Sequence, residues 1–224
     1  MPHQLLQPDF GAQAMLDAEA LDNDRLKVMP SAFYRDFSQD QLSLFCLRHG
    51  LYCLPTHELL DRINALILEV SPGRNAIEIG SGHGTLGHGL GIPCTDSYMQ
   101  EDPMIKQLYQ GAGQPPVRYG AHVKQLDAMD AVKHYRPEVV VAAWVTHKWK
   151  EQEAWREGNM FGVDEKAILR RIKRYVFVGN TRPHKHKPLL DVKHQAIRGD
   201  FLFSRSPTSH NVLWVWDKVA LGGK

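Results

Sequence analysis

The sequence predicts an α/β fold with a doubly wound, mainly parallel seven-stranded sheet, a C-terminal antiparallel hairpin and an N-terminal helical extension. From residue 54 onward, short apolar runs alternate with helical stretches, which is typical of parallel strands joined by crossover helices. Near the C-terminus, DFLFSRS and NVLWVWD are separated only by PTSH, which is too short for a crossover helix. These two runs are therefore expected to pair as the antiparallel hairpin.

Length and composition are those of one globular domain. The 224 residues are 43% hydrophobic and 23% charged, and the formal charge of +2 favours neither nucleic acid nor an acidic membrane surface as a partner. No run of about 18 apolar residues and no secretory leader pattern occurs, so we expect a cytoplasmic protein without a membrane span. Cys46, Cys53 and Cys94 form no CxxC motif and are expected to be free thiols.

The chain divides into an extension over residues 1–48 and a main domain over 49–224. The extension contains proline breaks and one helical pattern, AQAMLDAEAL. In the main domain, Pro55 and Thr56 provide a helix start before ELLDRINALILEV. One face of that helix carries Leu59, Leu60, Ile63, Leu66 and Ile67.

Five parallel strands are expected to precede the hairpin. Their ranges are 76–80, 92–96, 123–126, 139–145 and 175–179. The fourth, within EVVVAAWV, is apolar on both faces, as a central strand must be when helices cover both sides of the sheet. A further helix is expected in LLDVKHQAI, between the fifth strand and the sixth.

The first of these strands runs into a glycine-rich loop, NAIEIGSGHGTLGHGLG. Glycine permits positive φ and lets the backbone approach a ligand, although such a loop can also be only a tight connection between strand and helix. Glu78 lies two residues before Gly80, the glycine spacing differs from G-x-G-x-x-G, and no GK[ST] follows. These features disfavour a dinucleotide fold and a P-loop.

EIGSGHG resembles the first motif of class I S-adenosylmethionine (SAM)-dependent methyltransferases, and the strand order that ends in a hairpin resembles their seven-stranded sheet. The resemblance covers residues 51–218 and implies SAM as the cofactor. It implies that the backbone of Gly80, Ser81 and Gly82 lies along the methionine part of SAM. Glu78 would organise this loop or meet the amine of the cofactor.

The resemblance also implies contacts with the rest of the cofactor. Asp96, at the end of the second strand, would accept hydrogen bonds from the ribose hydroxyls, although it also suits a helix cap. Asp127 would face the adenine amino group, and Ala128 would offer its backbone N–H to the ring. Asp127 could instead cap the following helix, and Asp130 competes with it for either role.

Acceptor residues are expected beyond the carboxyl ends of the fourth and fifth strands, where open α/β sheets bind ligands. His147 is the candidate proton acceptor, and Asn180 is the second catalytic candidate. Tyr52 precedes the first strand where family members bring a lead-in helix over the cofactor, but it could also be a buried structural aromatic. Thr56 shares with Tyr52 the position before the first strand, and the substrate-side candidates are Tyr52, Trp144, Thr146, Thr181, Arg182 and His184.

The sequence therefore predicts a SAM-dependent methyltransferase whose acceptor is unidentified, with a small molecule or a protein favoured over nucleic acid. The fourth strand does not end in [DN]PP[YF], and no Pro-Cys motif suits attack on a cytosine ring. His184 and His186 lack acidic or cysteine partners nearby, so no metal is expected. The alternatives are a SAM-binding regulatory protein without turnover, a nicotinamide-dependent enzyme, or an RNA methyltransferase with phosphate contacts from Lys148, Lys150, Arg182, Lys185 and Lys187.

Overall fold

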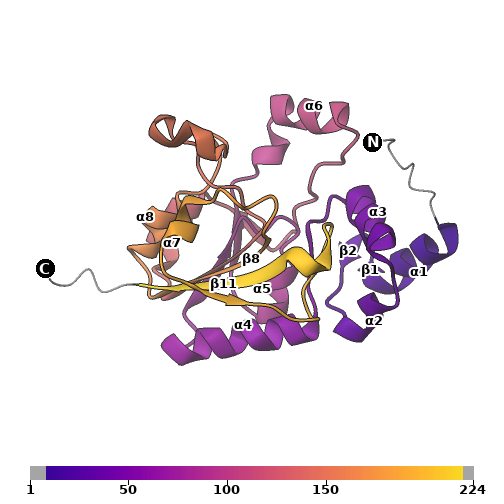
Figure 1. The fold of residues 1–224 in the computed structure, drawn as a ribbon, viewed down its shortest axis with the longest axis horizontal. Coiled ribbons are helices and arrows are strands. Elements are labelled where there is room, and N and C mark those ends of the chain that lie inside the picture. The colour runs from indigo at the N-terminus through magenta and orange to yellow at the C-terminus, as the bar shows by residue number, and fades with distance from the viewer. Residues whose placement is uncertain (1–8, 219–224) are drawn as a thin grey trace, which may run out of the picture.

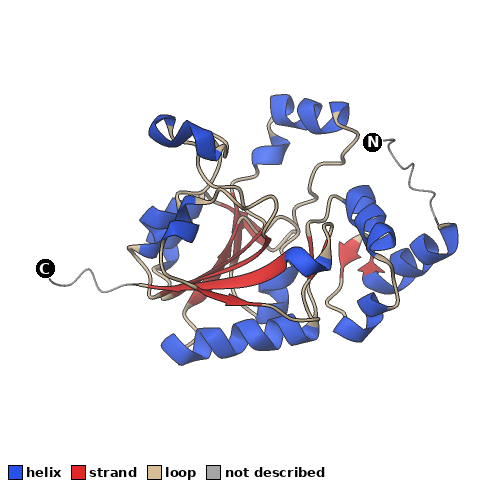
Figure 2. Cartoon of the chain, in the orientation of Figure 1, coloured by secondary structure: helices blue, strands red, loops and turns tan. Residues whose placement is uncertain are grey.

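A computed structural model describes residues 9–218, which fold around the seven-stranded sheet that the sequence predicts (Figures 1 and 2). The strand order is β6-β5-β4-β7-β8-β11-β9. The first five of these strands are mutually parallel, and β11 lies antiparallel to both of its neighbours. The sheet strands are β4 (Ala76–Ile79), β5 (Cys94–Asp96), β6 (Val123–Gln125), β7 (Val139–Ala143), β8 (Arg174–Asn180), β9 (Gln195–Ile197) and β11 (Asn211–Asp217).

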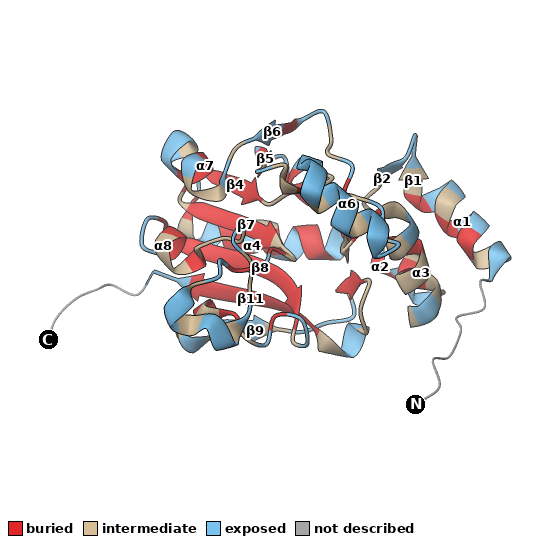
Figure 3. Ribbon diagram, turned by 90° about the horizontal axis from the view of Figure 1, so that it is seen from above, coloured by how far each residue is buried: buried red, intermediate tan, exposed pale blue. Residues whose placement is uncertain are grey.

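Helices cover both faces of the sheet, and each face has its own apolar cluster. One cluster joins the sheet to α4 (His57–Val70) and α5 (Thr85–Leu90). The other joins it to α7 (Ala128–Tyr135) and α8 (Glu165–Leu169). Strands β4 and β8 are buried along their whole length and β7 over all but its last residue (Figure 3), as the two-sided apolar pattern of the fourth strand predicts.

Helix α4 confirms the predicted start and the predicted apolar face. Thr56 is its N-cap, and the Thr56 hydroxyl accepts a hydrogen bond of 3.1 Å from the backbone N–H of Leu59. All five apolar residues predicted to share one face are buried. The same hydroxyl donates to the carbonyl of Phe201 at 2.9 Å, so the start of α4 is also tied to the C-terminal part of the chain.

The C-terminal antiparallel pairing is present, but the sequence assigned its sixth strand to the wrong segment. The partner of β11 is β9, within the stretch predicted to be helical, and only a short 3₁₀ turn over Pro188–Asp191 forms there. The segment predicted as a hairpin strand contains β10 (Phe203–Ser204), which pairs with β3 (Cys53–Leu54) in a separate two-stranded sheet. Phe203 thereby joins the apolar cluster of the N-terminal helices, whereas Phe201 and Leu202 pack with the cluster that joins the sheet to α4 and α5.

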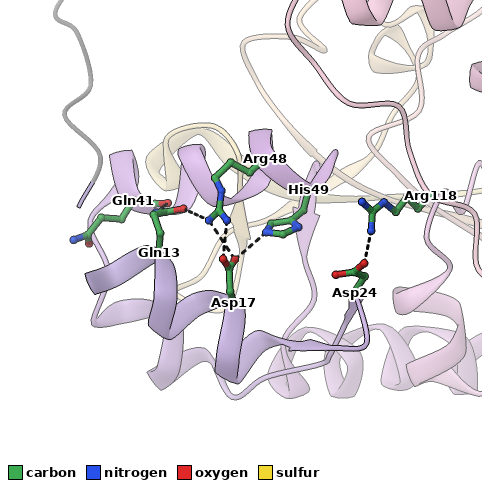
Figure 4. A network of polar contacts seen from close by, with 7 residues as sticks. All are labelled: Gln13, Asp17, Asp24, Gln41, Arg48, His49 and Arg118. Carbon is green, nitrogen blue, oxygen red and sulfur yellow. Dashed lines mark hydrogen bonds and ion pairs between the residues drawn. The ribbon is translucent and has the colours of Figure 1, made fainter. Parts of the chain in front are cut away.

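The N-terminal helices pack around a third apolar cluster. They are α1 (Phe10–Ala20), α2 (Ser31–Arg35) and α3 (Gln39–His49), with a small hairpin of β1 (Leu21–Asp22) and β2 (Arg25–Leu26) between the first two. Figure 4 shows that Asp17 of α1 accepts hydrogen bonds from Arg48 at 2.7 Å and His49 at 2.8 Å, so α1 is tied to α3. Leu51, Leu54 and Phe203 complete this cluster, so residues on both sides of the predicted boundary at residue 48 contribute to it.

No helix within residues 9–218 is both long enough and apolar enough to cross a membrane.

Candidate functional site

A cavity lies at the carboxyl ends of β4, β5 and β7, where the predicted site belongs. It has an empty volume of about 1090 Å³, part of which is open solvent at its mouth. The glycine loop forms its floor, and residues 50–55 and Leu26 of the N-terminal part form one wall. Two long connections contribute the rest: residues 96–119, which include helix α6 (Pro103–Gly111), and residues 144–163.

The glycine loop presents bare backbone to this cavity. Gly80 and Gly82 adopt φ values of 57° and 54°, in the left-handed region that side chains rarely enter. A Cβ on Gly80 would collide with Val145, and one on Gly82 would lie 3.2 Å from a methyl group of Val117. The loop is anchored from below because the N–H of Ser81 donates to the carbonyl of Thr95 at 3.0 Å.

Glu78 lies beneath the loop and lines the cavity. Its side chain is buried, and the carboxylate accepts a hydrogen bond of 2.9 Å from the N–H of Gly87 in α5. Burial raises the pKa of Glu78 to about 8, and the negative charge of Asp96 adds to the effect. A cationic ligand group in the cavity would favour the ionised carboxylate.

Asp96 fixes the glycine loop to the end of β5. One carboxylate oxygen accepts from the N–H of Gly82 and the other from the N–H of Tyr98, both at 2.9 Å. Burial raises the pKa of Asp96, while these backbone hydrogen bonds oppose that rise. Asp96 also lines the cavity, so it serves a local turn and faces the ligand space at once.

Asp127 occupies the capping position that the sequence left open. It is exposed, and its carboxylate accepts from the N–H of Met129 at 2.8 Å at the start of α7. Neither Asp127 nor Ala128 is among the residues that line the cavity, so the adenine contact stays a prediction. Asp130 is paired with Lys133 at 2.9 Å on the exposed face of the same helix.

Three of the predicted substrate-side residues, Tyr52, Trp144 and Thr146, do line the cavity. The Tyr52 and Trp144 rings lie 6.0 Å apart between centroids. Trp144 has a φ of 57°, which is unusual for a bulky residue, and its buried indole N–H has no hydrogen-bond partner. A buried donor without a partner in a cavity wall is suited to a ligand acceptor.

The structure does not bring the predicted catalytic residues to the cavity. The Nε2–H of His147 donates to the carbonyl of Arg156 at 3.0 Å, and burial lowers the pKa of His147. Asn180 is fully buried, and its amide donates to the carbonyl of Pro207 and to Asn211. The end of β8 is covered by residues 207–211 on the return to β11, so groups at this strand end bond within the protein.

The other residues predicted at the end of β8 are also engaged inside the protein or outside the cavity lining. The Thr181 hydroxyl lies 3.2 Å from the ring of His210. His184 is buried against Asn180, and burial lowers its pKa to about 3. Arg182 is exposed but does not line the cavity, whereas Thr56 caps α4 as described above.

Lys187 corrects one of the five phosphate contacts expected under the alternative of an RNA methyltransferase. The side chain is fully buried, and its ammonium lies 2.8 Å from Glu165, with which it forms an ion pair. It donates to the carbonyl of Val145 at 2.8 Å, and the hydroxyl of Tyr175 donates to Glu165 at 2.8 Å. Lys187 therefore stabilises the segment after β7 through its hydrogen bond to Val145, and its ammonium is not accessible to a polyanion.

Several cavity residues were not predicted because they lie on the two long connections and not at strand ends. The only feature of the sequence that could have indicated these residues is the length of the connections after β5 and β7, since functional loops are common at the carboxyl edge of a parallel sheet. Within the first connection, Gln100 accepts from the N–H of Val117 at 2.8 Å, which closes the loop over the cavity. The unpredicted polar or aromatic lining residues on these connections are Ser97, Gln100, Tyr109, Tyr119, Asn159 and Phe161; His83 and Thr85, at the glycine loop and the start of α5, were also not predicted.

No group of three or more His, Cys, Asp or Glu within the described range is placed to hold a metal ion. All three cysteines are free thiols in the structure.

Comparison with known proteins gives distant likenesses only. No protein-family model and no curated protein matches the sequence. Among solved structures, the 23S rRNA methyltransferase ErmE is 13% identical, with 75% of this chain and 71% of that chain covered and a TM-score of 0.37.

Two further structures are similarly distant. Magnesium protoporphyrin IX methyltransferase (ChlM) from Synechocystis PCC 6803, solved with bound SAM, is 12% identical over 70% of this chain and 77% of that chain, with a TM-score of 0.36. An uncharacterized protein from Listeria monocytogenes serotype 4b is 10% identical over 74% and 69%, with a TM-score of 0.37. The assignment of the fold rests instead on the strand order and on the antiparallel strand within the sheet. By that order, the chain has the mainly parallel seven-stranded sheet that the resemblance to class I SAM-dependent methyltransferases implies.

Proposed function

We propose that this chain binds SAM in the cavity and transfers its methyl group to an acceptor that enters from the mouth. The observation that carries the proposal is the combination, in one cavity, of a glycine loop with positive φ, the buried carboxylate of Glu78 and the half-buried carboxylate of Asp96. A cofactor with a cationic amine and ribose hydroxyls fits this donor and acceptor set.

The residues present suit the separate parts of SAM. The backbone of Gly80, Ser81 and Gly82 would lie along the methionine part, and Glu78 would face its amine. Asp96 would accept hydrogen bonds from the ribose, because a carboxylate retains free lone pairs after accepting one backbone hydrogen bond at each oxygen. When bound, SAM supplies an electrophilic methyl group: the acceptor's lone pair forms the new bond, the sulfur keeps the electrons of the broken bond, and the acceptor's proton leaves to water.

The chain's own contribution to the reaction would be alignment. Tyr52, Trp144 and Thr146 are the predicted acceptor-side residues that line the cavity, and none of them is a strong base. Methyl transfer to a good nucleophile needs chiefly that donor, methyl group and acceptor lie in line. Lys187 would maintain this arrangement indirectly, since it holds the carbonyl between Trp144 and Thr146.

The first test is titration calorimetry with the demethylated product S-adenosylhomocysteine. The wild-type chain should bind one equivalent, and Gly82→Val should lose measurable binding because the loop cannot keep its left-handed φ. Gly73→Val is the matched control, because a Cβ at Gly73 meets nothing within 4 Å and its φ is not positive. A folded wild-type chain that does not bind the product would refute the proposal.

The second test asks about turnover. The purified chain is incubated with cell extract and SAM labelled at the methyl carbon, and label is followed by size class. Gly82→Val serves as the inactive comparison. Product binding without transfer to any acceptor would indicate a SAM-binding regulatory protein.

A further inference from the structure

The mouth of the cavity is bordered by apolar side chains that the protein leaves exposed. Within residues 9–218, nine large hydrophobic side chains are exposed, and six of them belong to the two connections that surround the cavity. We call these six the rim, and each of them is between 44% and 72% exposed. The rim consists of Met104 and Leu108 on α6, and Trp149, Trp155, Met160 and Phe161 on the connection after β7.

The two halves of the rim stand on the same edge of the sheet. The connections leave the carboxyl ends of two parallel strands, β5 and β7, which lie on either side of β4. In Figure 1, α6 and the coil coloured for residues near 150 both rise above the body of the molecule. Helix α6 buries none of its residues (Figure 3), although it is strongly amphipathic in sequence. Of the rim residues, Phe161 lines the cavity, and Tyr109, which lies on α6 beside Leu108, lines it from the other connection.

The rim carries no surplus of positive charge. Residues 146–163 contain three basic side chains, Lys148, Lys150 and Arg156, against three acidic ones, Glu151, Glu153 and Glu157. Around α6, Lys106 stands against Glu101 and Asp102. A polyanion needs several unopposed cations to neutralise its phosphates, so this surface suits an uncharged partner better than RNA.

Two buried polar atoms, in residues that line the cavity, have no hydrogen-bond partner in the protein. They are the indole N–H of Trp144 and the side-chain oxygen of Asn159, and both residues line the cavity. One is a donor and the other an acceptor. Burying such groups without partners costs free energy, which a ligand group that can both accept and donate would recover.

We propose that the methyl acceptor is an uncharged, largely apolar small molecule that carries a hydroxyl or N–H group. The rim would bind its apolar skeleton, while Trp144 and Asn159 would bind the polar group inside the mouth. This proposal rests on the proposed function and specifies the substrate class for the same cavity.

The test uses two uncharged probes, a naphthol and naphthalene, which share a skeleton and differ in the hydroxyl. Each is titrated into the full chain saturated with S-adenosylhomocysteine. The naphthol should bind at one site. Phe161→Ser and Leu108→Ser should each lower the affinity for the naphthol by about fivefold to tenfold, because each removes apolar contact area. Leu68→Ser on α4 is the matched control, because Leu68 is 45% exposed but lies away from the rim.

Trp144→Phe separates the polar contact from the apolar one. It keeps an aromatic ring and removes the indole N–H, so it should weaken the naphthol and leave naphthalene unchanged. Equal affinity of the naphthol for the wild type and the rim variants would overturn the inference. A second result would also overturn it. In that result the naphthol does not bind, and the rim variants instead lose binding to an RNA hairpin, to neutral phosphatidylcholine vesicles or to a second copy of the chain.

These results remain distinct from failure of the proposed function. If the product binds and the naphthol does not, the methyltransferase proposal stands and the acceptor class is wrong. If the naphthol binds at the rim without any binding of the product, the apolar site stands and the assignment of SAM fails.

Discussion

Glu78 offers the sharpest test of the electrostatics beneath the glycine loop. It is buried on β4. The titratable groups that interact electrostatically with it are Cys53, Cys94 and Asp96. Glu78→Gln keeps the size of the side chain and the oxygen that accepts from Gly87, while it removes the ionisable group. The variant therefore isolates the effect of ionisation from that of packing.

The direction and size follow from the pKa. Burial raises the pKa of Glu78 from an ordinary value of 4.5 to about 8, so the folded chain holds this proton more tightly than the unfolded chain does. The contribution to stability is complete below pH 4.5 and is lost as the pH rises to about 8. At about 1.4 kcal/mol for each pH unit, the full difference is at most ~5 kcal/mol.

The assay is the free energy of unfolding by urea at about pH 5 and about pH 9, measured without ligand. The wild type should lose several kcal/mol relative to Glu78→Gln between these two conditions. Glu151→Gln, which changes an exposed carboxylate on the rim connection, is the control and should track the wild type. A difference between wild type and Glu78→Gln that does not vary with pH would refute the assigned pKa and its cause.

Three further outcomes follow from other titratable groups. Asp96→Ala should weaken the binding of S-adenosylhomocysteine by about 1–3 kcal/mol in calorimetry and should also lower the melting temperature without ligand. Both effects are expected because the carboxylate faces the cavity and accepts two backbone hydrogen bonds. Unchanged affinity would show that Asp96 is a purely structural residue. Glu165→Ala should lower the free energy of unfolding in urea by about 3–5 kcal/mol because it leaves Lys187 buried and unpaired. The double variant Glu165→Leu with Lys187→Met should recover most of this stability. Equal losses of stability in the single and the double variant would contradict this reasoning. Cys46 and Cys94 are buried and burial raises the pKa of their thiols, so a thiol reagent at neutral pH should label these two cysteines only after denaturation, and their fast labelling in the folded chain, measured by peptide mass analysis, would count against the structure.

The parts of the fold that the sequence predicts are those fixed by local pattern. Helix α4 has a capping threonine and a continuous apolar face, and β7 is apolar on both faces, so neither needed distant partners to be identified. Strands β9 and β10 are three and two residues long, and each acquires its partner only in the folded chain. Phe203 is apolar because it packs among the N-terminal helices, and its sequence neighbourhood does not reveal that partner.

Lys187 illustrates the same limit for the site. In the run RPHKHKP it resembles its exposed neighbours, yet its ammonium is buried against Glu165, which precedes it by more than twenty residues. Asn180 is likewise a polar residue at a strand end, where acceptor groups are expected. The chain that returns to β11 covers that end, and this depends on the strand pairing that the sequence did not predict correctly.

The two halves of the cavity differ in how strongly the surrounding structure constrains them. The proposed cofactor half consists of backbone and carboxylates at the ends of β4 and β5, where the glycine loop has little conformational choice. The proposed acceptor half stands on the connections after β5 and β7, whose rim residues are exposed and whose helix α6 contributes nothing to the core. A change in the rim therefore perturbs few packed contacts and leaves the hydrogen bonds of Glu78 and Asp96 intact. On this scaffold the acceptor can change while the cofactor site is retained, and for this reason the sequence motif points to the cofactor and not to the acceptor.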